Sequence, residues 1–158
     1  MERFTHLNVA SAFSGHYGVT RPEQLAEAAV SLGFDALAIT DRDGLYGAVK
    51  HIGACLKVGL SPIVGVNLLV FDDSGADLAR CIILCHGHTQ GAGWSQLCQI
   101  VSGAHSGRIF GSSKKSIGIK RSQLSKLIGD QANCTVLITP DSDVGREAIA
   151  GNRIRAKQ

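Results

Sequence analysis

Hydrophobic and polar residues alternate along the first half of the chain with the periods of strands and helices in turn. Thr20 and Glu23 have the spacing of a capping box, and Pro22 suits the first turn of a helix, which Gly33 would end. The expected elements are a strand at 5–9, a helix from 20 to 33, a strand at 36–40, a helix at 45–58 and a strand at 62–71. This β-α-β-α-β order predicts parallel strands with helices packed outside them.

The second half continues the alternation and shows no linker that would divide two domains. The expected elements are a strand at 81–85, a helix at 94–101, a basic loop at 103–118, a helix at 122–128, a strand at 135–139, a helix at 143–150 and a basic tail at 151–158. The pattern as a whole predicts one α/β domain over residues 1–158, built from mainly parallel strands and outer helices.

Composition narrows the class of protein further. The 158 residues are 44% hydrophobic and 18% charged, which is enough apolar material for a core and argues against a disordered chain. No apolar run is long enough for a membrane span, and the first residues lack the apolar stretch of a signal peptide. We therefore expect a cytoplasmic protein with no membrane partner, whose five cysteines are reduced thiols.

Positive charge is concentrated in the last third of the chain. Residues 1–105 hold six Lys and Arg against nine Asp and Glu, whereas residues 106–158 hold ten against four. Such a segment either binds DNA through its phosphates or is simply a solvated face. The candidate DNA contacts are Arg108, Lys114, Lys115, Lys120 and Arg121.

Polar side chains that could take part in catalysis or metal binding follow the first two expected strands. Parallel α/β folds place their functional groups at such strand ends. Four soft or borderline donors also follow one another at Cys81, Cys85, His86 and His88. On an extended strand, however, the two cysteines would lie about 13 Å apart at roughly 3.3 Å per residue, too far to bind one zinc ion.

Several ordered motifs carry a family resemblance. They are FTHLNVASAFS at 4–14, PEQL at 22–25, ALAITDRDGLYG at 36–47, PIVG at 62–65, WSQLC at 94–98, VLIT at 136–139 and GNRIRA at 151–156. Together they resemble the N-terminal PHP (polymerase and histidinol phosphatase) domain of bacterial C-family DNA polymerases, the group of error-prone DNA polymerases and polymerase III alpha subunits. The resemblance implies part of a distorted β/α barrel, truncated at about the first half of such a domain.

In that family the strand ends hold divalent metals for phosphoester hydrolysis. The positions that match the family's metal ligands carry other residues here: Asn8, Ala10, Tyr17, Arg42 and Asn67. Alanine offers no donor atom, and a guanidinium repels a cation. The resemblance therefore implies a metal-free, non-catalytic module that docks onto the rest of a polymerase. A half barrel also exposes strand edges, from which we expect pairing with another copy of the chain.

Two readings compete with this one. In the first, His6, Asp41, Asp43 and His105 form a divergent phosphoesterase or exonuclease site that uses Zn, Mn or Mg, completed by a second chain. In the second, the basic C-terminal third is a DNA-binding module. Asp41 and Asp43 also fit a simpler role, as carboxylates in a turn before a helix.

Overall fold

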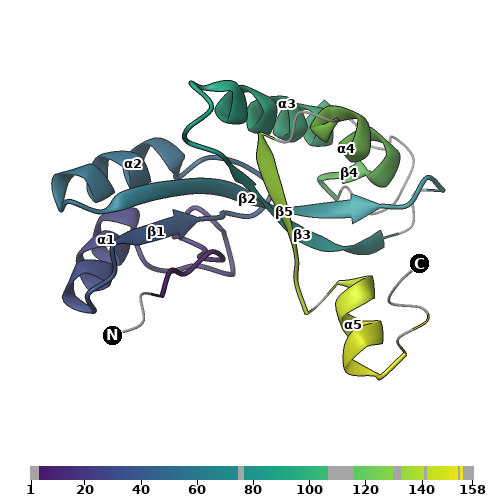
Figure 1. The fold of residues 1–158 in the computed structure, drawn as a ribbon, viewed down its shortest axis with the longest axis horizontal. Helices are drawn as coiled ribbons and strands as arrows, with labels where there is room; N and C mark the ends of the chain where they lie inside the picture. Colours follow the sequence, from purple (N-terminus) through teal and green to yellow (C-terminus); the bar gives the residue numbers. More distant parts are fainter. Residues whose placement is uncertain are drawn as a thin grey trace. The chain divides into compact units, whose positions relative to one another are not determined.

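The computed structural model describes residues 4–74, 77–106, 116–129, 133–140, 142–152 and 154 (Figure 1). These residues form two compact units, which divide between Asn67 and Leu68. Strand β2 (Ser61–Phe71) runs across this boundary and contributes to both units. That the chain is one truncated domain stays a prediction, and each unit is described by itself.

The first unit contains helix α1 (Pro22–Ser31), strand β1 (Ala36–Ile39), helix α2 (Ala48–Lys57) and the beginning of β2. Helix α1 is capped by Arg21, one residue later than expected, because the Arg21 backbone N–H donates to Gln24 Oε1 over 3.3 Å. Helix α2 also begins later than expected. Both helices and both strands otherwise lie where the hydrophobic pattern places them.

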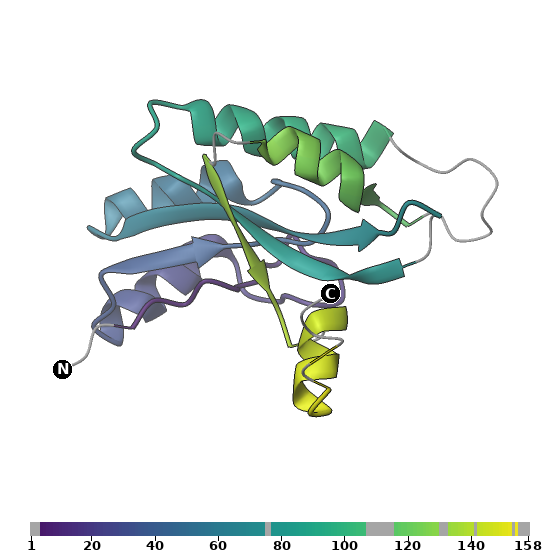
Figure 2. The ribbon, with the colours of Figure 1, turned by 45° about the vertical axis from the view of Figure 1, so that its right-hand side comes forward.

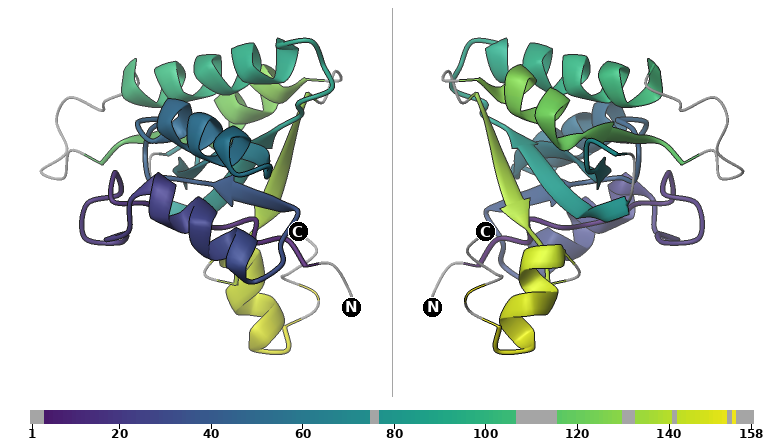
Figure 3. Two further views of the ribbon diagram at one scale, coloured as in Figure 1. Left: turned by 90° about the vertical axis from the view of Figure 1, so that its left-hand side faces the viewer. Right: turned by 90° about the vertical axis from the view of Figure 1, so that its right-hand side faces the viewer.

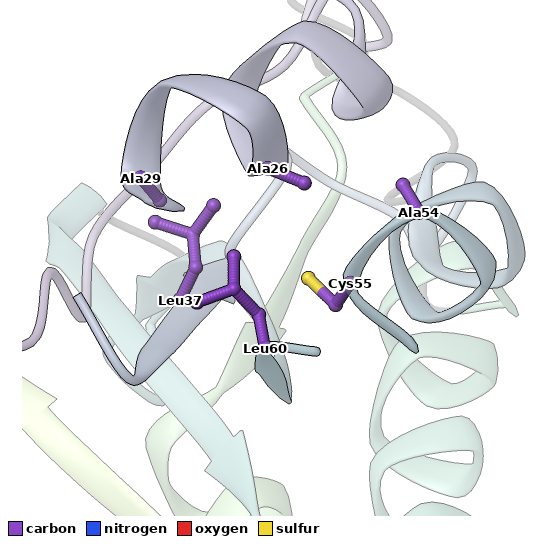
Figure 4. Close-up of a cluster of buried hydrophobic side chains, with 6 residues drawn as sticks. All are labelled: Ala26, Ala29, Leu37, Ala54, Cys55 and Leu60. Atoms are coloured by element: carbon purple, nitrogen blue, oxygen red, sulfur yellow. The ribbon is translucent and has the colours of Figure 1, made fainter. Parts of the chain in front are cut away.

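Small and apolar side chains make the core of the first unit. Helices α1 and α2 pack on each other and against β1 (Figures 3 and 4). Alanines dominate the contact, which lets the two helices approach closely. The buried cluster consists of Ala26, Ala29, Leu37, Ala54, Cys55 and Leu60.

The segment expected as a first strand, residues 5–9, is not a regular strand. It lies along β1, since Ala38 N–H donates to His6 O over 3.1 Å and Thr40 N–H donates to Val9 O over 2.8 Å. Two residues on β1 thus match three on the segment. This mismatch has the character of a bulge and interrupts the ladder.

Strand pairing around β2 is parallel, as expected. Strand β1 pairs with β2 from Ala36 opposite Ser61 to Ile39 opposite Val64. An isolated parallel bridge continues this pairing between Arg42 and Asn67. The residues that follow β1 are therefore held beside the middle of β2.

The second unit contains the end of β2 and all the helices and strands that follow it (Figure 2). Helix α3 contacts β3, β4 and β5, and α4 packs beside it. Their bounds are β3 Asp77–Cys85, α3 Ala92–Ser106, β4 Gly118–Lys120, α4 Arg121–Ile128, β5 Cys134–Ile138 and α5 Asp143–Ile149.

The sheet is mixed rather than wholly parallel. Strand order is β1-β2-β3-β5, with β4 paired to β2. Strands β3 and β5 are antiparallel, with Cys81 opposite Ile138 and Cys85 opposite Cys134. The link from β2 to β3 is too short for the crossover that parallel neighbours require, so β3 reverses direction.

The basic loop expected at 103–118 is partly regular structure. Helix α3 extends to Ser106, and Gly118–Lys120 form β4, parallel to β2. A side chain at Gly118 would collide with the Phe71 ring, and its Cβ would lie 2.7 Å from Leu69 O. The close approach of β4 to β2 therefore explains why residue 118 is a glycine. Residues 107–115 lie outside the described part of the chain.

No helix within the described ranges is long and apolar enough to cross a membrane.

Candidate functional site

Asp41 follows β1 and is almost completely buried, at 2% exposure. Its Oδ1 accepts hydrogen bonds from Ser11 N–H at 2.7 Å and from Ser14 Oγ at 2.7 Å. Ser11 Oγ lies 2.9 Å from both carboxylate oxygens. The buried carboxylate therefore holds the loop of residues 11–18 in place through charge-assisted hydrogen bonds.

The two serines are themselves held in place. Ser14 Oγ accepts from Arg42 N–H at 2.9 Å, and Ser11 Oγ accepts from Phe13 N–H at 3.2 Å. Ser14 N–H donates to Ser11 O at 2.8 Å, which closes a tight turn. Each hydroxyl thus acts as donor to Asp41 and as acceptor from the backbone.

Gly47 lies close beside the Asp41 carboxylate. Gly47, which caps α2, has no room for a side chain: a Cβ there would collide with Asp41 Oδ2 and lie 2.8 Å from Ile39 Cδ1. Asp41 consequently lies against the start of α2, where the helix dipole favours a negative charge. Its carboxylate accepts hydrogen bonds from Ser11 and Ser14, and α2 has no side-chain cap hydrogen bond, so a helix-start role for Asp41 stays a prediction.

Asn8 and Ala10 lie on the segment beside β1. Thr40 Oγ1 accepts from Val9 N–H at 2.9 Å and lies 3.3 Å from Asn8 Oδ1, to which it can donate. The Asn8 amide oxygen is thus within reach of a hydroxyl donor. Ala10 presents only a methyl group.

Arg42 and Tyr17 lie together. The Arg42 guanidinium carbon is 3.4 Å from the centre of the Tyr17 ring, a cation–π contact. The backbone around Arg42 is fixed by Asn67, because Asn67 N–H donates to Asp41 O and Asp43 N–H donates to Asn67 O, both at 3.0 Å. Three of the positions named from the family resemblance, Tyr17, Arg42 and Asn67, therefore surround the turn after β1.

The residues of the alternative hydrolytic site have different surroundings. The His6 ring lies 4.8 Å from the Phe4 ring and 5.2 Å from the Phe34 ring. Asp43 occupies the turn after Asp41 with a φ of 61°, and His105 lies in the last turn of α3. Among the described residues, no group of three or more His, Cys, Asp or Glu side chains is placed to hold a metal ion.

His51 is a further buried polar residue of the first unit. It is fully buried in α2, with Nε2 3.0 Å from Leu37 O and Cys55 Sγ 3.6 Å from the same nitrogen. Burial lowers its pKa below 6.5, opposed by the Leu37 carbonyl and the charge of Asp41.

The second unit carries the cysteine and histidine cluster. The rings of His86 and His88 stack with centroids 5.4 Å apart, and His86 Nε2 lies 2.7 Å from Thr135 Oγ1. Cys81 and Cys85 both lie on β3, as predicted. In contrast, no motif or spacing in the sequence connects Cys85 with Cys134.

Two of the five candidate DNA contacts are described. Lys120 ends β4 and donates from Nζ to Asp73 O at 3.3 Å, and Arg121 begins α4 with an exposed side chain. Arg108, Lys114 and Lys115 lie outside the described residues. DNA binding through this segment stays a prediction.

Comparison with known proteins identifies the class to which this arrangement belongs. Residues 6–146 match the PHP domain. The chain therefore belongs to the PHP domain family, as the sequence motifs predicted.

Its named relatives are bacterial polymerases. The DNA polymerase III subunit alpha of Buchnera aphidicola subsp. Schizaphis graminum (strain Sg) is 36% identical over 128 residues, 80% of this chain and 11% of that protein. The error-prone DNA polymerase of Anaeromyxobacter sp. (strain K) is 36% identical over 105 residues, 66% of this chain and 9% of that protein. The chain thus spans about a tenth of the length of these relatives.

A solved structure of an amidohydrolase from Chromobacterium violaceum also aligns, with a TM-score of 0.49 and 20% identity. The alignment covers 66% of this chain and 34% of that one.

Proposed function

We propose that this chain is the PHP segment of a C-family DNA polymerase, and that it serves as a metal-free scaffold that docks onto the polymerase body. The observation that supports the proposal is the hydrogen bonding of the Asp41 carboxylate. Its carboxylate accepts from Ser11 N–H, Ser11 Oγ and Ser14 Oγ, so both oxygens already have donors. A divalent cation would have to compete with these donors for the carboxylate.

The neighbouring positions Asn8, Ala10 and Arg42 supply at most one weak ligand. Ala10 has no donor atom, and Asn8 offers one neutral amide oxygen, 3.3 Å from the Thr40 hydroxyl. Arg42 places a permanent positive charge beside the same turn, stacked on Tyr17. These residues do not fit a multinuclear metal centre, and we derive no hydrolytic step through one.

Manganese binding tests the metal-free part of the proposal. We expect titration of the purified full chain with Mn²⁺ to show no stoichiometric site by calorimetry. We also expect no Mn²⁺-dependent hydrolysis of bis(4-nitrophenyl) phosphate above the buffer rate. A stoichiometric site that is lost in a folded Asp41→Asn variant would overturn the proposal and favour the phosphoesterase alternative.

A designed gain of ligands provides the matched control. The triple variant Asn8→His, Ala10→His and Arg42→His restores imidazole donors at three positions and removes the guanidinium. We expect this variant to bind Mn²⁺ or Zn²⁺ more tightly than the unmodified chain. Equal binding by both proteins would show that these positions do not determine metal affinity.

Docking is tested separately from metal binding. The chain is mixed with a C-family polymerase from which the corresponding PHP segment has been deleted, and the mixture is analysed by size-exclusion chromatography with light scattering. We expect a stable complex of the two. If the chain instead elutes as a dimer that contains no polymerase, the result would support self-association.

A further inference from the structure

Two cysteines face each other across β3 and β5 in the second unit. Cys85 ends β3 and Cys134 begins β5, and the antiparallel register places them directly opposite each other. Opposite residues in an antiparallel pair lie on the same face of the sheet. Their side chains therefore share one side of the β3–β5 ladder.

The hydrogen-bond pattern shows which kind of pair this is. His86 N–H donates to Asn133 O at 2.8 Å, so the adjoining pair of residues 86 and 133 is the hydrogen-bonded one. Pairs alternate along an antiparallel ladder, which makes Cys85 and Cys134 a non-hydrogen-bonded pair. Such pairs have Cα atoms about 4.5 Å apart, inside the range of about 4.4 to 6.8 Å that disulfides span.

The surroundings give the two thiols different properties. Cys134 is 3% exposed and lies under the start of α3, with Sγ 3.6 Å from Gly93 O. Burial, reinforced by the charge of the neighbouring Cys85, raises the pKa of Cys134 to about 11. Cys85 is only partly buried. Attack on a dissolved oxidant therefore begins at Cys85.

We propose that Cys85 and Cys134 form a reversible intramolecular disulfide that locks β5 to β3. The oxidant is a small-molecule disulfide. The Cys85 thiolate attacks one of its sulfurs, forming a mixed disulfide and releasing one small thiol. The Cys134 thiolate then attacks the Cys85 sulfur and releases the second small thiol. Two cysteine thiols are oxidised, the small disulfide is reduced to two thiols, and these carry away the two protons.

The two steps differ in their pH dependence. Resolution of the mixed disulfide requires the Cys134 thiolate, which is scarce at neutral pH. The rate of this internal step should therefore rise by up to about tenfold per pH unit while pH lies well below the Cys134 pKa, and it should level off as pH nears that pKa. The mixed disulfide on Cys85 should accumulate at pH 7 and convert faster at pH 9.

The test uses the folded full chain and oxidised glutathione. After incubation, remaining thiols are blocked with iodoacetamide, and the protein is digested and its peptides are fragmented in a mass spectrometer. We expect a Cys85–Cys134 link that dithiothreitol removes. Cys134→Ser should stop at one glutathione on Cys85, and Cys98→Ser, the matched control, should form the link normally.

Three results would overturn the proposal. One is a folded protein that forms no internal disulfide while its thiols remain reactive. Another is a link that joins Cys81 or Cys98 in place of the named pair. The third is a Cys85–Cys134 link that appears only in urea, because such a link would not depend on the strand register.

Discussion

Asp41 accepts hydrogen bonds from three donors on Ser11 and Ser14 in a buried position, so its replacement should cost stability. In Asp41→Asn, an NH₂ group replaces one carboxylate oxygen, so a hydrogen-bond donor would face the donors of Ser11 and Ser14. We expect the free energy of unfolding to fall by about 2 to 4 kcal/mol, measured by urea denaturation followed by circular dichroism.

Glu27→Gln is the matched control for this carboxylate-to-amide change. Glu27 lies on α1 with an exposed side chain, so its replacement should alter stability by less than about 0.5 kcal/mol. Equal effects of the two substitutions would contradict the anchoring role of Asp41.

Sequence reasoning located Asp41 but not its partners. It proposed Asp41 both as a metal ligand and as a turn residue, because an aspartate after a strand suits either role. Ser11 and Ser14 lie in the same motif segment, yet their contact with Asp41 spans about thirty positions of the chain. Only the path of the chain beside β1 brings these hydroxyls to the carboxylate.

His51 should make stability depend on pH. Leu37 O can only accept, so Nε2 carries the proton of the neutral ring. Burial lowers the pKa in the folded state, so the unfolded chain binds a proton more readily. Stability should thus be constant above about pH 6.5 and fall as pH drops below it, by at most about 1.4 kcal/mol per pH unit.

The measurement is the free energy of urea unfolding at several values between pH 7.5 and 5.5, for the unmodified chain and for His51→Leu. The variant should lose most of the slope even if its absolute stability changes. A slope that is the same in both proteins would show that other groups cause it.

At the scale of elements, the close approach of α3 to the ends of β3 and β5 depends on Gly93. A Cβ at this position would lie 2.7 Å from both Asn133 O and His86 O. Gly93→Ala should therefore force backbone to move and destabilise the protein by about 1 to 3 kcal/mol, measured by thermal or urea unfolding.

Gly53→Ala makes the opposite prediction on α2. A Cβ at Gly53 meets no atom within 4 Å, and the residue lies inside the helix. The substitution should stabilise the protein by roughly 0.5 to 1 kcal/mol through lower backbone entropy in the unfolded chain. Destabilisation by both alanines would argue against a steric cause at Gly93.

Elements with long apolar periodicity were predictable, whereas those created by pairing were not. Helix α1 and strand β2 follow their own patterns closely. Strand β4 is three residues long in a Gly, Ser and Lys-rich region, and its pairing with β2 defines it. The strand predicted at residues 5–9 is the opposite case: its apolar run suits a strand, but the bulge against β1 interrupts the pairing.

At the scale of the whole molecule, the ordered motifs were sufficient to predict the family, since they follow one another in the family's order along most of the chain. The motifs alone could not reveal the division into two compact units. That division depends on contacts between distant segments. Among the described strands, β2 is the one that carries buried residues in both units, with Val64 and Val66 in the first and Leu68 and Val70 in the second.

This shared strand predicts that the two units unfold together. Loss of the first unit would free the beginning of β2 and weaken the end that pairs with β4. Trp94, the single tryptophan of the chain, lies on α3 and reports on the second unit. Asp41→Asn acts in the first unit, yet it should shift the urea midpoint of Trp94 fluorescence as far as that of far-ultraviolet circular dichroism. A Trp94 transition that stays in place, while circular dichroism gains an earlier phase, would show that continuity of β2 does not couple the two units.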